Sequence, residues 1–419
     1  LSLATGITIW LWWLAKPSDY PYSLFLIFSL GQLTGLVGTV WLALTLLLST
    51  RITQIEDMFG GLDKVYRAHH LLGIGSFVML LLHPLLLSVE LLPNWRAFFA
   101  MFWLSSNRAM NAGVMGIYVM IFAFIFIALI KLPYHIWLWT HRVLGLAILF
   151  GGAHALLIGS DIAVFSFLKI WMGWWIILGS ISAVYAIIFY KMLGPRYFYR
   201  LSKVKTSNGV VQLHLQPTTK KRLAFVAGQF VSLQLISKAV SREMHPFSIV
   251  SAPEDAVMRL AAKQLGDYTT LLAAAEPGDM AVIYGPNGRL GHQLSPAEVW
   301  ITGGIGITPF VSMARSLNQQ QLPQDVTLLY MVRNRKEAIF IDELQQIATN
   351  MPRLKVVLWE SASQGRLEVK EIDRQVGLAR ISTVRLCGPR SMMMSMSVQL
   401  QQKGIAANAI VFEDFAFVR

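Results

Sequence analysis

Cysteine is almost absent from this chain of 419 residues, which contains only Cys387. A single thiol excludes an internal disulfide and a cysteine-ligated iron–sulfur cluster. Charge is also scarce, since Asp, Glu, Lys and Arg make up 14% of the residues whereas 55% are hydrophobic. This balance is too apolar for an ordinary soluble domain of this length and predicts a membrane protein.

Features of nucleic-acid binding are missing as well. The net charge is +13, yet no basic run with interleaved aromatic residues appears. Nucleic acid is therefore not an expected partner. The excess charge suits an anionic membrane surface or a phosphorylated cofactor.

The apolar residues gather in the first part of the chain. Long apolar runs extend to about residue 193, and a mixed pattern typical of a soluble α/β protein begins after Pro195. We therefore expect a membrane domain over 1–193. The strand and helix patterns of the remainder divide it into 196–295 and 296–419.

The apolar runs predict six membrane-spanning helices, because a bilayer core about 30 Å thick needs roughly 20 apolar residues in helical form. The candidate runs are 1–15 (short), 23–48, 68–92, 111–130, 135–158 and 170–193. Lys and Arg concentrate in the loops on one side, which places that side, both termini and the soluble half in the cytoplasm. These residues are Arg51, Lys64, Arg67, Lys131, Lys191, Arg196, Arg200, Lys203 and Lys205.

Histidines occupy two of these spans at matching depths. His69 and His141 lie near the cytoplasmic ends of spans three and five, and His83 and His154 lie towards the outer side. At 1.5 Å per residue, 13 or 14 residues separate the two levels by about 20 Å. Ionisable side chains inside a membrane usually mark a function, and two imidazoles per level supply axial nitrogens for two stacked haems.

The spacing in span five does not fit an ideal helix. Thirteen residues separate His141 from His154, which misses the same helix face by about 140°. Span five therefore needs a local distortion, for which Gly151 and Gly152 are the candidates, or its two ligands face differently oriented haems.

Other interpretations of the histidines stay open. They are alternatively interhelical hydrogen-bonding groups, or part of a metal-transport path, although spans four to six carry no Asp, Glu or Cys to complete one. His70 is an alternative ligand to His69. The echo of HHLLG (69–73) in HRVLG (141–145) favours His69.

The soluble half shows two successive patterns. Residues 196–295 alternate polar and apolar side chains with period two, as in GVVQLHLQP (209–217) and GQFVSLQLI (228–236), which predicts an antiparallel β-barrel. From residue 298 strand and helix patterns alternate, which predicts a doubly wound α/β sheet with crossover helices.

Four short motifs fall where such folds bind nucleotides. GGIGITPF (303–310) stands at the first strand–helix junction, where glycines admit a pyrophosphate and the helix start supplies amide donors. Pro309 replaces the third glycine of the usual fingerprint. LCGPRSM (386–392) follows a later strand of the same sheet, HPFSIVS (245–251) lies on a barrel strand, and GDYTTLL (266–272) opens a helix. Taken singly, each motif is equally a structural turn, strand end or helix cap.

Together with the paired histidines and a terminal aromatic residue, these motifs resemble the NADPH oxidase and ferric reductase family over roughly residues 23–419. The resemblance implies a six-helix, two-haem membrane domain fused to a ferredoxin–NADP reductase-type dehydrogenase. The compact length suggests a bacterial member.

The resemblance also assigns cofactors to residues. The inner haem would be ligated by His69 and His141, and the outer haem by His83 and His154. The flavin would be held by His245, Pro246, Phe247 and Ser248, and the FAD pyrophosphate by Gly266, Asp267, Tyr268 and Thr269. The NADPH pyrophosphate would contact Gly303, Gly304, Gly306, Thr308 and Pro309, and the nicotinamide pocket would be lined by Cys387, Gly388 and Pro389.

Two further assignments carry alternatives. Phe417, with Phe415 in reserve, would stack on the flavin ring, and its alternative role is a buried terminal anchor. Arg333 and Arg335 would clamp the 2′-phosphate of NADPH, because guanidinium groups suit bidentate phosphate contacts. Solvated surface charge is the alternative for both arginines.

The function implied by the resemblance is a transmembrane oxidase. It would pass electrons from cytoplasmic NADPH through FAD and two b-type haems to oxygen outside, giving superoxide or hydrogen peroxide, with Cys387 and Phe417 beside the reacting rings. A ferric chelate is the alternative acceptor, and a redox sensor or a transporter are rival functions. The expected partners are NADPH, oxygen or ferric chelate, and the lipid bilayer of the cell membrane. No EF-hand loop or proline-rich segment is visible, so no obligatory activator protein is expected.

Overall fold

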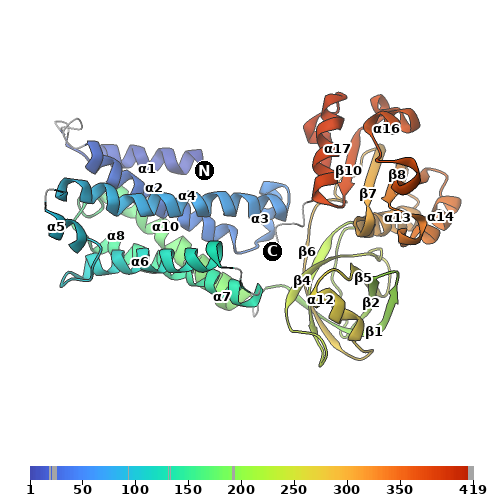
Figure 1. Ribbon diagram of the computed structural model, residues 1–419, viewed down its shortest axis with the longest axis horizontal. Coiled ribbons are helices and arrows are strands. Elements are labelled where there is room, and N and C mark those ends of the chain that lie inside the picture. Colours follow the sequence, from blue (N-terminus) through green and yellow to red (C-terminus); the bar gives the residue numbers. More distant parts are fainter. Residues whose placement is uncertain are drawn as a thin grey trace. The chain divides into compact units, whose positions relative to one another are not determined.

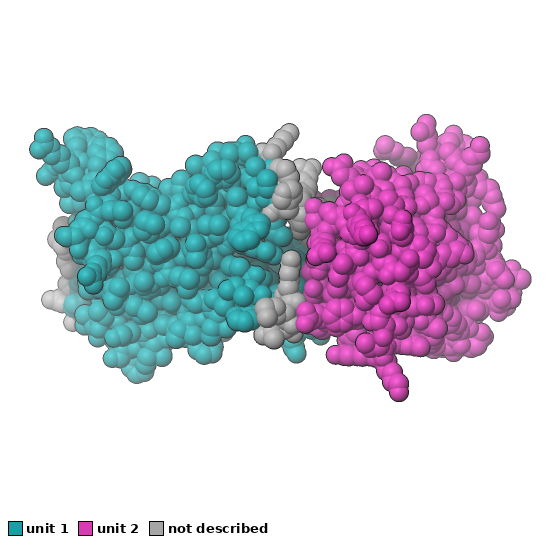
Figure 2. All heavy atoms as spheres, turned by 90° about the horizontal axis from the view of Figure 1, so that it is seen from below, with its two compact units in different colours: residues 1–194, 419 teal, residues 195–418 magenta. Residues whose placement is uncertain are grey.

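The computed structural model describes residues 1–17, 20, 26–92, 94–130, 132, 134–190 and 194–413. The chain forms two compact units, residues 1–194 and 195–418, which are coloured teal and magenta in Figure 2. The first unit is helical, and the second contains two β-sheets with their helices (Figure 1).

Among the described residues of the first unit, five helical segments are long and apolar enough to cross a membrane, and α1 (Ser2–Leu14) is a shorter apolar helix. The five contain α2 (Leu26–Leu48), α4 (Leu62–Ser88), α6 (Arg108–Phe124), α7 (Tyr134–Val143) with α8 (Gly145–Leu157), and α10 (Ser166–Val184). Single π-helical turns, Ile125–Leu129 and Tyr185–Phe189, extend α6 and α10. The predicted helical membrane bundle is confirmed. Short helices α3 (Thr53–Phe59), α5 (Trp95–Ala100) and α9 (Asp161–Val164) lie in the connections.

The third span begins earlier than the sequence pattern indicates, at Leu62 rather than at residue 68. Its first turns are amphipathic: Leu62 and Val65 are buried, whereas Lys64 and Arg67 are exposed. A search for continuous apolar residues misses such a start because charged side chains interrupt the run.

The distortion expected in span five exists, but its predicted position was wrong. The span breaks at Leu144, between α7 and α8, and Gly151 and Gly152 lie inside regular helix. The N–H of Leu144 bonds to the carbonyl of His141 (3.2 Å), and the N–H of Ala147 bonds to the carbonyl of Leu144 (3.0 Å). Such three-residue bonds turn the chain by about 120° per residue instead of 100°. This extra rotation turns His154 towards the helix face that carries His141.

Small residues let the helices approach closely. A Cβ at Gly38 of α2 would lie 2.8 Å from the Leu80 side chain of α4, and one at Gly75 of α4 would lie 2.6 Å from Trp41 of α2. In lipid the hydrophobic effect does not drive helices together, so van der Waals contacts at such glycines stabilise the packing of the helices. Helix α2 lies along α4 in Figure 1, and α8 packs on α6 and α10.

The first sheet of the second unit is the predicted antiparallel barrel. It contains β1 (Arg196–Ser207), β2 (Val210–Pro217), β3 (Phe230–Ile236), β4 (Met244–Ser248), β5 (Met258–Lys263) and β6 (Met280–Asn287), in the order β4-β3-β6-β1-β2-β5. An antiparallel bridge between Ile249 and Leu260 joins the chain beyond β4 to β5 and closes the sheet on itself. Helix α12 (Asp267–Leu271) follows β5.

The second sheet is parallel, as predicted for the nucleotide-binding half. It contains β7 (Ala297–Gly303), β8 (Asp325–Val332), β9 (Leu354–Glu360), β10 (Thr383–Cys387) and β11 (Ile410–Phe412), in the order β11-β10-β7-β8-β9. Its helices are α13 (Thr308–Gln320), α14 (Ile341–Asn350), α16 (Val369–Val376) and α17 (Arg390–Gln402), with the single turn α15 (Ser361–Gln364) after β9. The sequence pattern missed α16, a short helix of eight residues.

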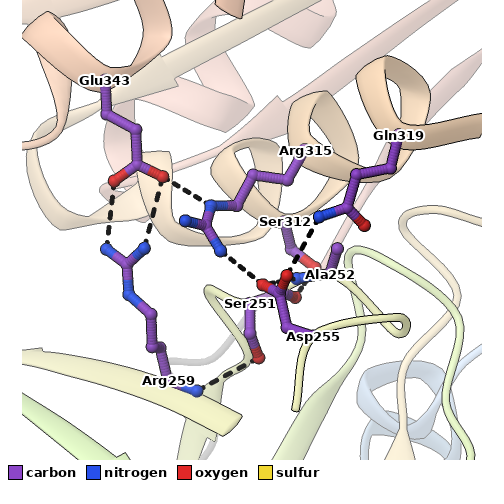
Figure 3. Close-up of polar contacts among 8 residues, drawn as sticks. All are labelled: Ser251, Ala252, Asp255, Arg259, Ser312, Arg315, Gln319 and Glu343. Atoms are coloured by element: carbon purple, nitrogen blue, oxygen red, sulfur yellow. Dashed lines mark hydrogen bonds and ion pairs between the residues drawn. The ribbon is translucent and has the colours of Figure 1, made fainter. Parts of the chain in front are cut away.

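The barrel and the parallel sheet share one hydrophobic core. Val250 and Leu290 of the barrel half pack with Trp300 and Phe310 of the α/β half, and all four are buried. A polar network covers the same junction (Figure 3). Ser312 of α13 donates a hydrogen bond of 2.6 Å to the carbonyl of Ser251.

Charged residues complete this network. Glu343 of α14 accepts hydrogen bonds from Arg259 of β5 (3.1 and 3.3 Å) and from Arg315 of α13 (2.5 Å). Arg315 also contacts Asp255, which lies in the barrel half before β5 (Figure 3). The four side chains therefore alternate in charge across the junction, which fixes the two sheets as one unit.

Candidate functional site

Two pairs of imidazoles face each other in the membrane unit. The ring centroids of His69 (α4) and His141 (α7) are 5.9 Å apart, and those of His83 (α4) and His154 (α8) are 6.2 Å apart. All four rings are half-buried. His70 is exposed, so the structure pairs His69 with His141 and leaves His70 outside the pair.

Backbone carbonyls orient three of the four rings. Nδ1 of His69 lies 2.9 Å from the carbonyl oxygen of Thr45, and Nδ1 of His83 lies 2.7 Å from that of Gly31, both on α2. Nδ1 of His154 lies 2.9 Å from the carbonyl oxygen of Ala109 on α6. A nitrogen that faces a carbonyl must carry the proton, so Nε2 of each ring keeps the free lone pair. This is the usual arrangement around metal-bound histidine.

Glycines make room for two of these contacts. Gly35 stands four residues after Gly31, and a Cβ there would lie 2.6 Å from Nδ1 of His83. Gly113 stands four residues after Ala109, and a Cβ there would lie 2.9 Å from Nδ1 of His154. In a helix, the side chain four residues after a carbonyl normally covers that carbonyl. Because glycine has no side chain at this position, the imidazole ring can reach the carbonyl oxygen.

The fourth ring is held differently. His141 stacks nearly parallel on Trp137, with ring centroids 5.2 Å apart and 12° between the planes. Its Nδ1 is buried and has no hydrogen-bond partner among the described residues. Packing rather than a hydrogen bond therefore sets the orientation of this imidazole.

These pairs fit two haems. One iron bound by two imidazoles from opposite sides, with metal–nitrogen bonds of about 2 Å, has their ring centroids roughly 6 Å apart. The observed separations of 5.9 and 6.2 Å match this value. Within the described ranges no three His, Cys, Asp or Glu side chains gather as a group.

The nucleotide motifs of the second unit meet at one edge of the parallel sheet. Strands β7 and β10 are parallel neighbours, with Ile301 opposite Leu386 and Thr302 opposite Cys387. Their carboxyl ends carry the 303–310 and 386–392 motifs, which therefore lie side by side. A Cβ at Gly306 would lie 2.5 Å from the carbonyl oxygen of Cys387, so this close approach requires glycine. Open sheets bind nucleotides at this edge.

The other residues of the 303–310 motif shape the turn. Gly304 has φ +56°, and nothing lies within 4 Å of an added Cβ, so its role is conformational. Thr308 donates a hydrogen bond of 3.0 Å to the carbonyl of Ile305. Pro309 occupies the first turn of α13, where its missing N–H costs nothing.

Cys387 lies at the end of β10 and is only 3% exposed. Burial, with a smaller effect from the carboxylate of Glu413, raises the pKa of its thiol. A thiol with a raised pKa stays protonated at neutral pH. Gly388, with φ +153°, and Pro389 lead from it into α17.

The two candidate phosphate clamps follow β8, the neighbour of β7. Arg333 and Arg335 are exposed, and Arg335 makes only a loose ion pair with Asp342, at 3.7 Å. The backbone N–H of Arg335 donates to Glu360 (2.8 Å), which holds the turn while leaving the guanidinium accessible.

The flavin motifs come together on the barrel. His245 of β4 lies against Tyr268 of α12, with ring centroids 3.9 Å apart and 30° between the planes. Nε2 of His245 also lies 2.9 Å from Oε2 of Glu243. Phe247 is buried in the barrel core, next to Pro246 and the half-buried Ser248.

Thr269 is already engaged at the start of α12. Its hydroxyl accepts hydrogen bonds from the N–H groups of Leu265 (3.0 Å) and Gly266 (3.1 Å). Thr269 thus shapes the turn that carries Gly266 and Asp267, the other candidates for the pyrophosphate.

Phe415 and Phe417 lie outside the described residues. The last described residue, Glu413, is 6% exposed and accepts hydrogen bonds from the N–H groups of Arg289 and Leu290 in the segment after β6. The sequence did not single out this anchor. Nothing in the sequence around Glu413 indicates that its carboxylate accepts hydrogen bonds from residues more than 120 positions earlier.

The glycine–carbonyl contacts of the membrane unit were also missed. Gly31 with Gly35 and Ala109 with Gly113 share a four-residue spacing, which is the only sequence signal for them. Its meaning appears only when α2 is known to face α4 and α6 is known to face α8.

Comparison with known proteins places a family in each part of the chain. Residues 34–152 match the ferric reductase like transmembrane component, residues 198–277 match an FAD-binding domain, and residues 300–397 match an oxidoreductase NAD-binding domain. The histidine pair His69–His141 and His83 fall within the first match.

Similar individual proteins cover only part of the chain. Flavohemoprotein A of Dictyostelium discoideum is 24% identical over 232 residues, which is 51% of this chain and 58% of that protein. Methane monooxygenase component C of Methylosinus trichosporium is 32% identical over 161 residues, 36% of this chain and 46% of that protein. The chain thus spans about half the length of these relatives.

One solved structure also aligns with part of the chain. The FAD/NAD binding domain of nitric oxide dioxygenase from Vibrio cholerae aligns with 52% of this chain and 98% of its own, at 23% identity and a TM-score of 0.47. The chain therefore combines a ferric reductase-like transmembrane component with FAD- and NAD-binding domains, which is the architecture of the NADPH oxidase and ferric reductase type.

Proposed function

We propose that the protein carries electrons from cytoplasmic NADPH through FAD and two b-type haems to oxygen on the outer side of the cell membrane, releasing superoxide. The proposal depends above all on the two facing imidazole pairs at the separation that one iron requires. The balanced reaction is one NADPH and two oxygen molecules giving NADP⁺, a proton and two superoxide ions. The two electrons of the hydride therefore leave one at a time.

The membrane residues hold and separate the haem sites. Thr45, Gly31 and Ala109 fix three imidazoles with Nε2 free, and Trp137 packs the fourth. Fourteen residues of α4 separate His69 from His83, a rise of about 20 Å along the helix. When bound, the haems supply one-electron carriers at these two depths.

The two imidazoles of each pair would both ligate the iron of one haem. A haem held in this way would offer oxygen no free coordination position and would supply electrons by outer-sphere transfer. No general base or nucleophile is needed, which agrees with the neutral, buried Cys387 thiol.

The nucleotide residues bind and orient NADPH. The turn at Gly303, Gly304 and Gly306 and the start of α13 would receive the pyrophosphate, because helix N-termini attract anions. Arg333 and Arg335 would bind the 2′-phosphate, and the Cys387–Pro389 turn would contact the nicotinamide. His245, Tyr268 and the Gly266–Thr269 turn would hold FAD, which accepts two electrons and releases them singly.

The second candidate function is reduction of a ferric chelate by the same path. The match to a ferric reductase like transmembrane component favours it, and the exposed Arg96 and Arg108 would attract an anionic chelate. Both arginines lie on the outer side in the proposed orientation.

One comparison separates the two functions. Purified protein in nanodiscs receives FAD and NADPH, and oxygen consumption in air is compared with reduction of ferric citrate under argon. The proposal predicts oxygen consumption with a superoxide dismutase-sensitive signal and slower ferric reduction. Rapid ferric reduction with little oxygen consumption would replace it with the second function, and NADPH turnover too slow to follow with either acceptor would favour a sensor.

A further inference from the structure

The two imidazole pairs are not held alike. In the His83–His154 pair both Nδ1 atoms face a backbone carbonyl, at 2.7 and 2.9 Å. In the His69–His141 pair only His69 does so, at 2.9 Å, and the buried Nδ1 of His141 has no hydrogen-bond partner within the described residues.

The difference arises from local backbone structure. Thr45 lies in the last turn of α2, where the N–H of Ser49 bonds to Leu46, so its carbonyl is open to His69. The carbonyls of Gly31 and Ala109 lie within helices and become accessible only because Gly35 and Gly113 lack side chains. The chain thus uses two glycines to supply hydrogen-bond acceptors to the His83–His154 pair alone.

A hydrogen bond at Nδ1 changes the metal site. An imidazole that donates its proton to a carbonyl is a stronger base at Nε2. A stronger base stabilises ferric iron more than ferrous iron, which lowers the reduction potential of the haem. Second-shell hydrogen bonding is one of the main influences of a protein on such a potential.

We propose that Gly35 and Gly113 act as positioning residues that set the haem of the His83–His154 pair at a lower reduction potential than the haem of the His69–His141 pair. This inference depends on the proposed function, since it requires a haem at each pair.

Cations lie near both pairs, so the difference between the pairs comes from the hydrogen bonds at Nδ1. Arg67 precedes His69 by two residues and Arg142 follows His141, whereas Arg108 precedes Ala109, whose carbonyl faces His154.

The order of potentials suits the proposed acceptor. Oxygen is a poor one-electron acceptor, so a low potential on the outer side increases the driving force of the final transfer. Electron transfer from the His69–His141 level to the His83–His154 level would then be less favourable. It would still proceed, because oxygen removes the electrons from the second level.

The test is a spectroelectrochemical titration of haem absorbance in purified full-length protein. The variants are Gly35→Ala and Gly113→Ala, whose new Cβ atoms would displace the rings of His83 and His154 from their carbonyls. Gly173→Ala is the matched control, because it also changes glycine to alanine inside a membrane helix but has nothing within 4 Å of the added Cβ.

The wild type should show two components of similar amplitude. Gly35→Ala and Gly113→Ala should each raise the lower component and leave the upper one in place, and Gly173→Ala should move neither. If a displaced ring releases its haem, the component that vanishes should be the lower one.

Coincident wild-type potentials, a shift or loss of the upper component, or two silent glycine variants would overturn the inference while leaving the haems assigned. Complete absence of haem from the wild type would instead overturn the proposed function, and the inference with it.

Discussion

Nδ1 of His83 lies 2.7 Å from the carbonyl oxygen of Gly31 on the facing helix. Because the ring reaches a carbonyl that normally belongs to the α-helical ladder alone, the contact depends on the missing side chain of Gly35. The contact leaves Nε2 of the ring with its lone pair free, and the ring centroid lies 6.2 Å from that of His154. A backbone carbonyl thus orients the imidazole that we propose as a haem ligand.

Removal of single imidazoles should remove single haems. His83→Ala or His154→Ala should each lower the haem content by about half, and His69→Ala or His141→Ala should remove the other half, because each variant lacks one of the two imidazoles that would hold one haem. His70→Ala is the matched control and should keep both haems, since His70 is exposed outside the pair. The haem-to-protein ratio from pyridine haemochrome spectra measures this. Full haem content in His69→Ala with loss in His70→Ala would reverse the assignment.

The two arginines after β8 should select the phosphorylated cofactor. Replacement of both Arg333 and Arg335 by Ala should raise the KM for NADPH at least about tenfold, because even one charge-assisted hydrogen bond contributes about 1.5–3 kcal/mol. The KM for NADH, which lacks the 2′-phosphate, should hardly change. Steady-state kinetics with both nucleotides test this, with the exposed Arg353→Ala as control. Equal changes for the two nucleotides would mean that the arginines have only a structural role.

Gly306 should tolerate no side chain. In Gly306→Ala the new Cβ would lie 2.5 Å from the carbonyl oxygen of Cys387, and the two backbone turns must separate. We expect the rate of flavin reduction by NADPH to fall at least tenfold, measured by stopped-flow absorbance. Flavin content and reduction of the haems by dithionite should remain as in the wild type. A normal rate would show that the two turns do not form one nucleotide site.

The ion-pair network of Figure 3 should make the second unit sensitive to acid. Burial opposes ionisation of Glu343, but the hydrogen bonds and charges of Arg259 and Arg315 outweigh it and lower the pKa of Glu343. A lowered pKa in the folded state contributes stability above the unfolded value of about 4.3, and this stability is lost as the pH falls through the folded pKa.

Glu343→Gln tests this dependence. At pH 7 the variant should release its flavin at a lower temperature than the wild type. The decrease should be about 2–4 °C for each kcal/mol of unfolding free energy that is lost, and flavin fluorescence during heating measures it. The difference from the wild type should begin to shrink below about pH 4.3, where the carboxylate of the unfolded chain takes up a proton, and should be lost once the pH falls below the lowered pKa of the folded state. A difference that stays constant from pH 7 down to pH 3.5 would show that the charge of Glu343 does not contribute.

Much of this fold follows directly from sequence patterns. The long apolar runs, the period-two strands and the strand–helix alternation depend on local physical preferences, so they predicted the helical membrane domain, the barrel and the parallel sheet. The junction of the 303–310 and 386–392 motifs was also predictable, since the carboxyl ends of parallel strands share one edge of a sheet.

The remaining features depend on contacts between distant segments. Gly145 stands directly after the break at Leu144, but nothing local distinguishes it from Gly151 and Gly152, which suggested a distortion that packing does not produce. Gly35 and Gly113 serve histidines 48 and 41 positions away in the sequence, and Glu343 meets Arg259 across the junction of two sheets. Such pairings follow from tertiary packing, which no local pattern encodes.

The most direct test of the account is an anaerobic absorbance spectrum of the purified, FAD-supplied protein before and after addition of NADPH. The account predicts sharp bands of reduced b-type haem within seconds, because electrons must pass from the nucleotide site to both histidine pairs. Haem bands that respond to dithionite but not to NADPH would contradict the proposed path between the two units, and absence of haem bands would contradict the assignment of the histidines.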